Sequence, residues 1–269
     1  MFRQLEQLNY GIIDCHVNVG KYIYIDLPEN DTWDTFETAH LLLGNCDRFK
    51  IEAALVCNFE SIFYNPSIGN AALSTIQQQT SGRLMGLATV HPLLKSAPSD
   101  LLHAIDVLKL HGLKLHPSYQ RFTPTDSRVQ PLFELCGAHN APVMFHCGTT
   151  QASCHPEILA KVAQQHPKCT FIFAHMGGTN VHLTAEAIRK LDNVYLETSV
   201  SRPVFDPIRS VANRIGIGRL LFGSDFPCGS IQLELFRIFD AGFTDEELRL
   251  VLRDNFLSLF KRCGKLSFL

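Results

Sequence analysis

Short apolar segments recur along the whole chain, and longer amphipathic segments separate them. The short segments are rich in β-branched or aromatic residues and are apolar on both faces, a pattern typical of strands covered on both sides of a parallel sheet. The pattern predicts eight strands, at Gly11–Cys15, Glu52–Cys57, Leu84–Val90, Gly112–Leu115, Pro142–Phe145, Thr170–Ala174, Val194–Glu197 and Leu220–Gly223.

Helical spacing characterises the segments between these strands. Apolar residues recur at three and four positions in 101–108, and Gly112 is expected to stop that helix. Similar spacing predicts helices at Pro156–Gln165 and Thr184–Leu191. The last predicted helix opens with a capping box of Thr244 and Glu247 and then carries apolar residues on one face as far as Phe260.

Eight strand–helix units in 269 residues give 269/8, about 34 residues per unit, which suits a barrel of alternating strands and helices. An open, doubly wound sheet is the alternative, but no G-x-G-x-x-G or P-loop motif follows any predicted strand. No linker rich in proline, glycine or serine interrupts the pattern. We therefore predict an α/β protein with a single (β/α)8 barrel domain spanning residues 1–269.

Composition excludes several classes of partner. Charged residues make up 19% of the chain and the formal net charge is −2, without a basic stripe, so neither nucleic acid nor an anionic membrane is expected as a partner. The nine cysteines form no C-x-x-C pair, which fits a reducing compartment. No segment has the length of a signal peptide or a membrane span. The expectation is a cytoplasmic protein.

Ionisable side chains follow most of the predicted strands. They are Asp14, His16, Lys114, His116, His146, His175, Glu197 and Asp225. Each one alone has an ordinary explanation, such as a helix cap, a loop histidine or an ion pair between Lys114 and Glu197. A barrel, however, brings the carboxyl ends of all its strands to one face. Nitrogen and oxygen donors meeting there would suit zinc, manganese or iron with an open position for water.

The motifs together resemble the amidohydrolase superfamily, and more narrowly its amidohydrolase-related branch of metal-dependent TIM-barrel hydrolases, lactonases and aminocarboxymuconate-semialdehyde-type decarboxylases. The resemblance extends from Ile12 to about Phe260. It rests on the order of the segments IIDCHVN, GLKLHP, VMFHCG, FIFAHMGG, VYLETS, LLFGSDFP and LRDNFLSLF.

The resemblance implies a metal site and a role for each strand-end residue. The implied metal ligands are His16, His146, His175 and Asp225, with Asn18 in the place of a second histidine of the family's D-x-H-x-H motif. Asn18 is the main departure, because an amide oxygen is a weaker zinc ligand than imidazole. The metal is then retained by the other four residues, or a harder ion such as Mn²⁺ is preferred, or the site is impaired.

Lys114 occupies the position of a lysine that some superfamily members carbamylate, and we expect it to bind substrate. The other expected substrate contacts are His116, Arg121 and Arg202. The long segment from Val17 to Thr32 is either a lid over the mouth or a hairpin packed on the barrel.

Three functions remain open. The first is a hydrolase in which a water activated by one divalent ion, zinc or alternatively manganese, attacks a lactone, amide or ester carbonyl of a small carboxylate-bearing molecule. Asp225 would then be the general base and His175 would stabilise the oxyanion. The second is a non-oxidative decarboxylase of an aromatic or unsaturated acid. The third is a catalytically impaired barrel. In each case the partner is a small molecule, and barrels of this kind often form homo-oligomers.

Overall fold

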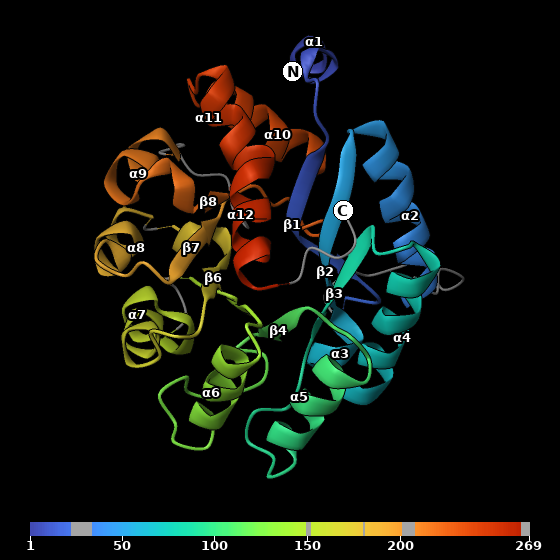
Figure 1. Ribbon diagram of the computed structural model, residues 1–269, viewed down its shortest axis with the longest axis vertical. Coiled ribbons are helices and arrows are strands. Elements are labelled where there is room, and N and C mark those ends of the chain that lie inside the picture. Colours follow the sequence, from blue (N-terminus) through green and yellow to red (C-terminus); the bar gives the residue numbers. More distant parts are fainter. Residues whose placement is uncertain (23–33, 149–151, 180, 201–207, 265–269) are drawn as a thin grey trace.

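Eight parallel strands form one sheet, in the order of the chain, in the computed structural model (Figure 1). The structure describes residues 1–22, 34–148, 152–179, 181–200 and 208–264. The strands are β1 (Ile12–Val19), β2 (Ile51–Asn58), β3 (Leu84–Ala88), β4 (Gly112–Leu115), β5 (Val143–Phe145), β6 (Phe171–Phe173), β7 (Val194–Glu197) and β8 (Leu220–Leu221). Their side chains are buried on both faces almost throughout, as the apolar pattern predicts.

The sheet closes on itself between β8 and β1. Val17 forms a parallel bridge with Phe226, and the Cys15 amide donates to the Phe222 carbonyl at 2.8 Å. The Asp225 amide donates to the His16 carbonyl at 2.8 Å. The (β/α)8 barrel is therefore confirmed, and the open doubly wound alternative is wrong.

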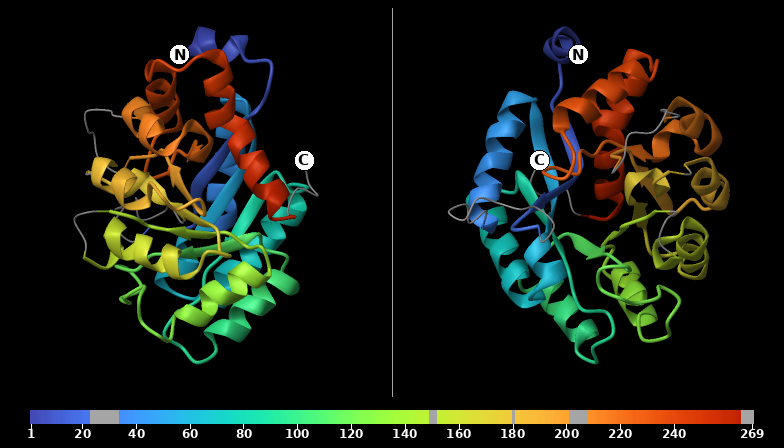
Figure 2. Two further views of the ribbon diagram at one scale, coloured as in Figure 1. Left: turned by 60° about the vertical axis from the view of Figure 1, so that its left-hand side comes forward. Right: turned by 180° about the vertical axis from the view of Figure 1, so that it is seen from behind.

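Helices surround the strands on the outside (Figures 1 and 2). They are α1 (Phe2–Gln7), α2 (Thr35–Arg48), α3 (Phe59–Phe63), α4 (Pro66–Gln79), α5 (Ala97–Asp106), α6 (Gln130–Ala138), α7 (Pro156–Gln165), α8 (Val181–Ile188), α9 (Ile208–Ile215), α10 (Ile231–Asp240) and α11 (Asp245–Arg249). Each longer helix buries one apolar face against the strands, for example Leu42 and Cys46 of α2.

The final helix, α12 (Asn255–Arg262), has a different place from the others. It lies across the centre of the ring in Figure 1. Phe256, Leu259 and Phe260 belong to the same buried cluster as the inward-facing strand residues, and the Phe260 ring lies 6.2 Å from that of His111, just before β4. The helix therefore closes the amino-terminal end of the barrel, which leaves the carboxyl-terminal end for a site.

The predicted strands lie where the observed ones do, but several boundaries differ: β1 ends at Val19 instead of Cys15, and α8 spans Val181–Ile188 instead of Thr184–Leu191. The capping box of Thr244 and Glu247 opens α11, and a π-helical turn at Leu250–Asp254 joins α11 to α12. The expected helix stop at Gly112 is wrong, because α5 already ends at Asp106 and Gly112 begins β4. A Cβ at Gly112 would lie 2.4 Å from the Pro142 carbonyl oxygen, so glycine is required there by close strand contact.

None of the helices in the described ranges is both long and apolar enough to cross a bilayer.

Candidate functional site

His16 is held at the carboxyl-terminal end of the barrel by Glu197 of β7, two strands away around the closed sheet. Its Nδ1 donates to Glu197 Oε2 at 2.9 Å, and both side chains are buried. This bond fixes the tautomer and leaves the Nε2 lone pair facing the centre of the site, as in many metal-binding histidines. Glu197 fits because Gly223, which follows β8, has no side chain: a Cβ there would lie 2.3 Å from Glu197 Oε1.

Glu197 is the centre of a larger hydrogen-bond network. Its Oε2 also accepts from the His175 amide at 3.1 Å and from Ser199 Oγ at 2.8 Å, and its Oε1 accepts from the Ser199 amide. Burial raises the pKa of this carboxyl, but the His16 ring, the His175 ring and the hydrogen bonds outweigh burial and hold the pKa at about 2. Glu197 is thus a carboxylate that orients two histidines at once.

His175 follows β6 in a left-handed backbone conformation, with φ of 61°. Such strain in a residue other than glycine is often found at functional sites. Its Nδ1 lies 3.0 Å from Ser199 Oγ. Since the Ser199 proton points to Glu197, His175 Nδ1 must donate, and its Nε2 keeps a lone pair that faces His146 Nδ1 at 3.1 Å. Burial lowers the pKa of His175, and the neighbouring His146 and His16 lower it further.

Asp225 follows β8, also with a left-handed backbone at φ of 54°. Its Oδ1 accepts from Asn18 Nδ2 at 2.8 Å and lies 3.5 Å from His16 Nε2. Burial raises the pKa of the Asp225 carboxyl, while His16 and Lys114 oppose this effect. Asp225 is not the cap of the next helix, because Ser230 caps α10.

Asp14 ties the two closing strands together. Its Oδ1 accepts from the His16 amide at 3.1 Å and from the Ser224 amide at 3.0 Å. Burial raises the pKa of Asp14 to about 8. Asp14 therefore positions the backbone of His16 in β1 and of Ser224 after β8.

One group of side chains in the described part of the chain is spaced to hold a metal ion. His16, His175 and Asp225 each offer one donor atom, and all three atoms lie within 4.8 Å of one another. Two imidazoles and one carboxylate suit zinc or manganese and leave positions for other ligands. The residues present therefore fit a single divalent ion.

Two further residues that sequence reasoning assigned to the metal lie beside this group. His146 turns its Nδ1 to His175 and is not one of the three clustered donors. Asn18 presents its amide nitrogen, not its oxygen, to Asp225. The expectation that these two residues bind the metal stays a prediction.

Lys114 reaches into the same site from β4. Its Nζ lies 2.9 Å from His16 Nε2, and the side chain is only 2% exposed. Because His16 donates from Nδ1, its Nε2 accepts this bond from the ammonium. Within the described ranges, no carboxylate forms an ion pair with Lys114; the anticipated partner, Glu197, binds His16 instead.

A stack of flat rings borders the site on the side of β4 and β5. The His116 ring lies between those of Tyr119 and His146, at centroid distances of 3.8 and 3.9 Å and interplanar angles of 19° and 12°. Burial lowers the pKa of both histidines, and so does the Lys114 charge. The hydroxyl groups of Tyr119 and Tyr22 lie 2.9 Å apart, which connects the stack to the segment after β1.

The remaining expected contacts are not part of this cluster. Arg121 is exposed on the loop after β4; its amide donates to the Ser118 carbonyl, and its side chain forms no hydrogen bond with the cluster among the described residues. Arg202 and residues 23–32 of the expected lid lie outside the described residues. Sequence reasoning missed the roles of Glu197 and Ser199, although the strand-end motif ETS was visible.

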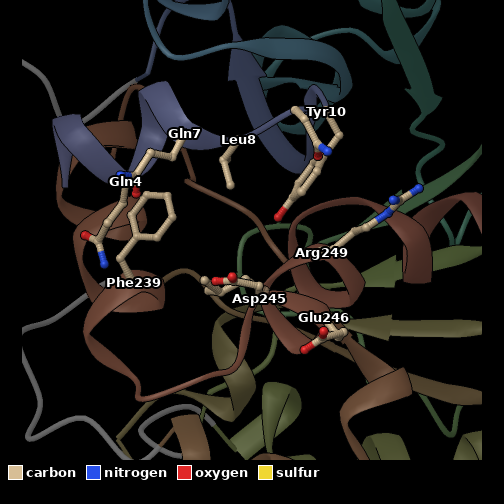
Figure 3. A pocket seen from close by; sticks show the side chains of 10 residues that line it. Gln4, Gln7, Leu8, Tyr10, Phe239, Asp245, Glu246 and Arg249 are labelled. Atoms are coloured by element: carbon tan, nitrogen blue, oxygen red, sulfur yellow. The ribbon is translucent and has the colours of Figure 1, made fainter.

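A separate hollow of about 350 Å³ lies at the amino-terminal side of the barrel, between α1 and the α10–α11 region (Figure 3). Its lining includes Gln4, Tyr10, Asp245 and Arg249. None of its lining residues belongs to the strand-end cluster, so the candidate site remains at the carboxyl ends of the strands.

Solved structures with the same fold include three decarboxylases. The 2,6-dihydroxybenzoate decarboxylase from Rhizobium has 15% sequence identity and a TM-score of 0.73, over 94% of this chain and 99% of that one. The dihydroxybenzoic acid decarboxylase from Polaromonas sp. JS666, with bound manganese and 2-nitroresorcinol, has 15% identity and a TM-score of 0.74, over 96% and 100%. The 5-carboxyvanillate decarboxylase from Sphingomonas paucimobilis has 14% identity and a TM-score of 0.73, over 94% and 99%.

At this level of identity the structures establish the fold, and family membership needs sequence evidence. No curated protein matches the chain. The amidohydrolase family model, however, matches residues 67–262, which include Lys114, His146, His175, Glu197 and Asp225. This match covers most of the barrel and five of the strands that supply residues to the site. The chain is therefore a member of the amidohydrolase family of enzymes.

Proposed function

We propose that this protein is a metal-dependent decarboxylase of a planar carboxylic acid, aromatic or unsaturated. The observation that carries the proposal is the surroundings of Lys114. A buried ammonium without a carboxylate partner among the described residues lies beside three metal donors and a stack of flat rings. Because Asp225 would bind the ion and Glu197 already binds His16, an anionic substrate supplies the counter-ion of Lys114 once the ion is bound.

Formal charges support a substrate with one negative charge. The formal charge of the site without metal or substrate is −2 + 1 = −1, from the carboxylates of Glu197 and Asp225 and the ammonium of Lys114. A divalent ion changes this sum to +1, and a monoanionic substrate then makes it zero. A neutral ester or lactone would leave the buried site with a net positive charge, whereas a carboxylate-bearing one would balance the charge as an acid does.

The ring stack supports a planar substrate. His146 is partly exposed and forms one end of the stack, with its ring nearly parallel to that of His116. Flat π-systems at these distances favour offset stacking with another flat group. An aromatic or conjugated acid therefore matches the shape of this side of the site better than a tetrahedral, saturated molecule.

The similar structures favour decarboxylation over hydrolysis. Three of them are decarboxylases of hydroxylated aromatic acids by their names, and one of these holds manganese. Hydrolysis, the first expectation from the sequence, has less support than its decarboxylase alternative. The manganese in that structure supports Mn²⁺, as well as Zn²⁺, as the ion of the proposed site.

The roles of the residues follow from their positions. When bound by His16, His175 and Asp225, a divalent ion supplies positive charge for substrate oxygens. Lys114 donates a hydrogen bond to the substrate carboxylate and holds it in place. The bond between the ring or vinyl carbon and the carboxylate breaks, its electron pair stays on that carbon, and CO₂ leaves. Asp225 takes up a proton from solvent and passes it to the same carbon, which balances the loss of CO₂.

The experiment is a CO₂-release assay with carboxyl-¹³C-labelled 2,6-dihydroxybenzoate and 5-carboxyvanillate, run in D₂O on protein loaded with Mn²⁺ or Zn²⁺. We expect ¹³CO₂ and one deuterium at the vacated carbon. The Asp225→Asn variant should lose activity by roughly 10²- to 10⁴-fold, the usual contribution of a general acid. A lactone panel serves as the comparison for hydrolysis.

Turnover of a lactone with no CO₂ from any labelled aromatic or unsaturated acid would contradict the proposal. So would full decarboxylase activity in Asp225→Asn. If the metal-loaded protein catalyses neither reaction, the third alternative is favoured, in which Asn18 in place of a histidine leaves the barrel catalytically impaired.

A further inference from the structure

All three candidate metal donors already accept a hydrogen bond from a nitrogen of the chain. Lys114 Nζ binds His16 Nε2 at 2.9 Å, and Asn18 Nδ2 binds Asp225 Oδ1 at 2.8 Å. The third donor, His175, has His146 Nδ1 at 3.1 Å from its Nε2. The protein itself thus supplies hydrogen-bond donors to the lone pairs that a metal ion would use.

Lys114 differs from the other two hydrogen-bond donors because it carries a full positive charge. A divalent ion binds imidazole nitrogen at about 2.0–2.1 Å, so it cannot share His16 Nε2 with an ammonium at hydrogen-bond distance. The ammonium must leave this nitrogen when the ion binds. Its charge also repels the ion, and this repulsion is strong in a buried site.

The surroundings offer Lys114 little compensation when it moves. Glu197 is engaged by His16, Ser199 and the His175 backbone. Asp225 would itself bind the ion. The displaced ammonium therefore stays near the ion as an uncompensated charge until an anion enters the site.

We propose that Lys114 is an internal cation that competes with the divalent metal for His16, and so lowers the metal affinity of this protein. The proposal rests on the metal site of the proposed function but does not depend on the reaction catalysed there. Lys114 is here a positioning residue: in the metal-free protein its ammonium satisfies the lone pair of His16.

The test is isothermal titration calorimetry of the full chain with MnCl₂ in the absence of any substrate. Lys114→Met removes the charge and keeps most of the side-chain volume, and it should bind Mn²⁺ at least roughly tenfold more tightly than the wild type. Lys114→Arg keeps the charge and should show no gain. Lys161→Met, at an exposed position on α7, is the control for an equal change in net charge.

Equal Mn²⁺ affinity in the wild type and Lys114→Met would overturn the proposal, and so would absence of binding in both. A gain of the same size in Lys161→Met would also overturn it, because the effect would then be that of net charge. Tighter Mn²⁺ binding by Lys114→Met, together with no CO₂ release from any acid by the metal-loaded wild type, would support the competition and contradict the decarboxylase function.

A crystal structure of the wild type soaked in MnCl₂ tests the same proposal if Lys114→Met does not fold. The expected result is an ion on His16 and Asp225, with the Lys114 ammonium displaced beyond hydrogen-bond distance of His16 Nε2. An ion bound elsewhere while Lys114 remains on His16 would overturn it.

Discussion

Replacing Glu197 by glutamine tests the network that orients both histidines. Glutamine keeps one acceptor oxygen and replaces the other by an amide nitrogen. Glu197 Oε2 now accepts from His16, the His175 amide and Ser199, while Oε1 accepts from the Ser199 amide. Whichever way the glutamine is turned, its NH₂ group faces at least one donor, and a buried hydrogen bond is lost.

The size of the effect follows from the pKa of Glu197. A fall from 4.5 to about 2 in the folded protein corresponds to about 3 kcal/mol in favour of the carboxylate. We expect Glu197→Gln to lower the free energy of unfolding by about this amount at pH 7, measured by urea denaturation. The control Glu186→Gln breaks an exposed ion pair with Arg189 and should cost less than about 1 kcal/mol.

The same variant predicts a pH dependence. Because the folded-state pKa of Glu197 is depressed, its stabilising contribution is complete above pH 4.5 and is lost as the pH falls through about 2. The difference in unfolding free energy between the wild type and Glu197→Gln should therefore shrink over this interval. A difference below about 1 kcal/mol at pH 7, or one that does not change down to the acid limit of folding, would refute the reasoning.

Three further substitutions follow from the same structure. Gly223→Ala puts a Cβ 2.3 Å from Glu197 Oε1 and should lower the free energy of unfolding, measured by urea denaturation, by about 1–3 kcal/mol. The control Gly44→Ala in α2 has open space around it and should leave the free energy of unfolding unchanged or raise it. Phe256→Ala removes a buried ring from the barrel interior and should lower the free energy of unfolding by about 3–5 kcal/mol in the same experiment. A decrease below about 1 kcal/mol would contradict the closure of the barrel by α12. Asn18→His should raise Mn²⁺ or Zn²⁺ affinity roughly tenfold in calorimetry, and unchanged affinity would mean that position 18 lies out of reach of the ion.

The barrel was predictable because its strands are apolar on both faces and evenly spaced. The strands at Gly112–Leu115 and Val194–Glu197 are observed with the predicted bounds. The place of α12 was not predictable. Leu252 and Phe256 share one apolar pattern in the sequence, yet Leu252 packs in the outer layer and Phe256 in the barrel interior. Periodicity identifies the buried face of a helix, but it does not tell whether that face packs in the layer between helices and strands or inside the barrel.

The convergence of His16, His175 and Asp225 was predictable because strand ends of a barrel share one face. The pairing inside the cluster was not, because it depends on contacts across the closed sheet. Glu197 binds His16 and not Lys114, since Gly223 leaves room for the carboxylate next to β8. No residue type or spacing in the sequence reports that packing.

The most direct test of the account is the metal content of the chain, because every role assigned to the site depends on the cluster of His16, His175 and Asp225. The protein should be purified without chelators or a metal-binding tag, equilibrated with excess Mn²⁺ or Zn²⁺, freed of unbound metal and measured by inductively coupled plasma mass spectrometry. We expect about one ion per chain in the wild type and a loss of that ion in His16→Ala. A wild type that retains no ion, or a His16→Ala variant that retains the same amount, would contradict the account.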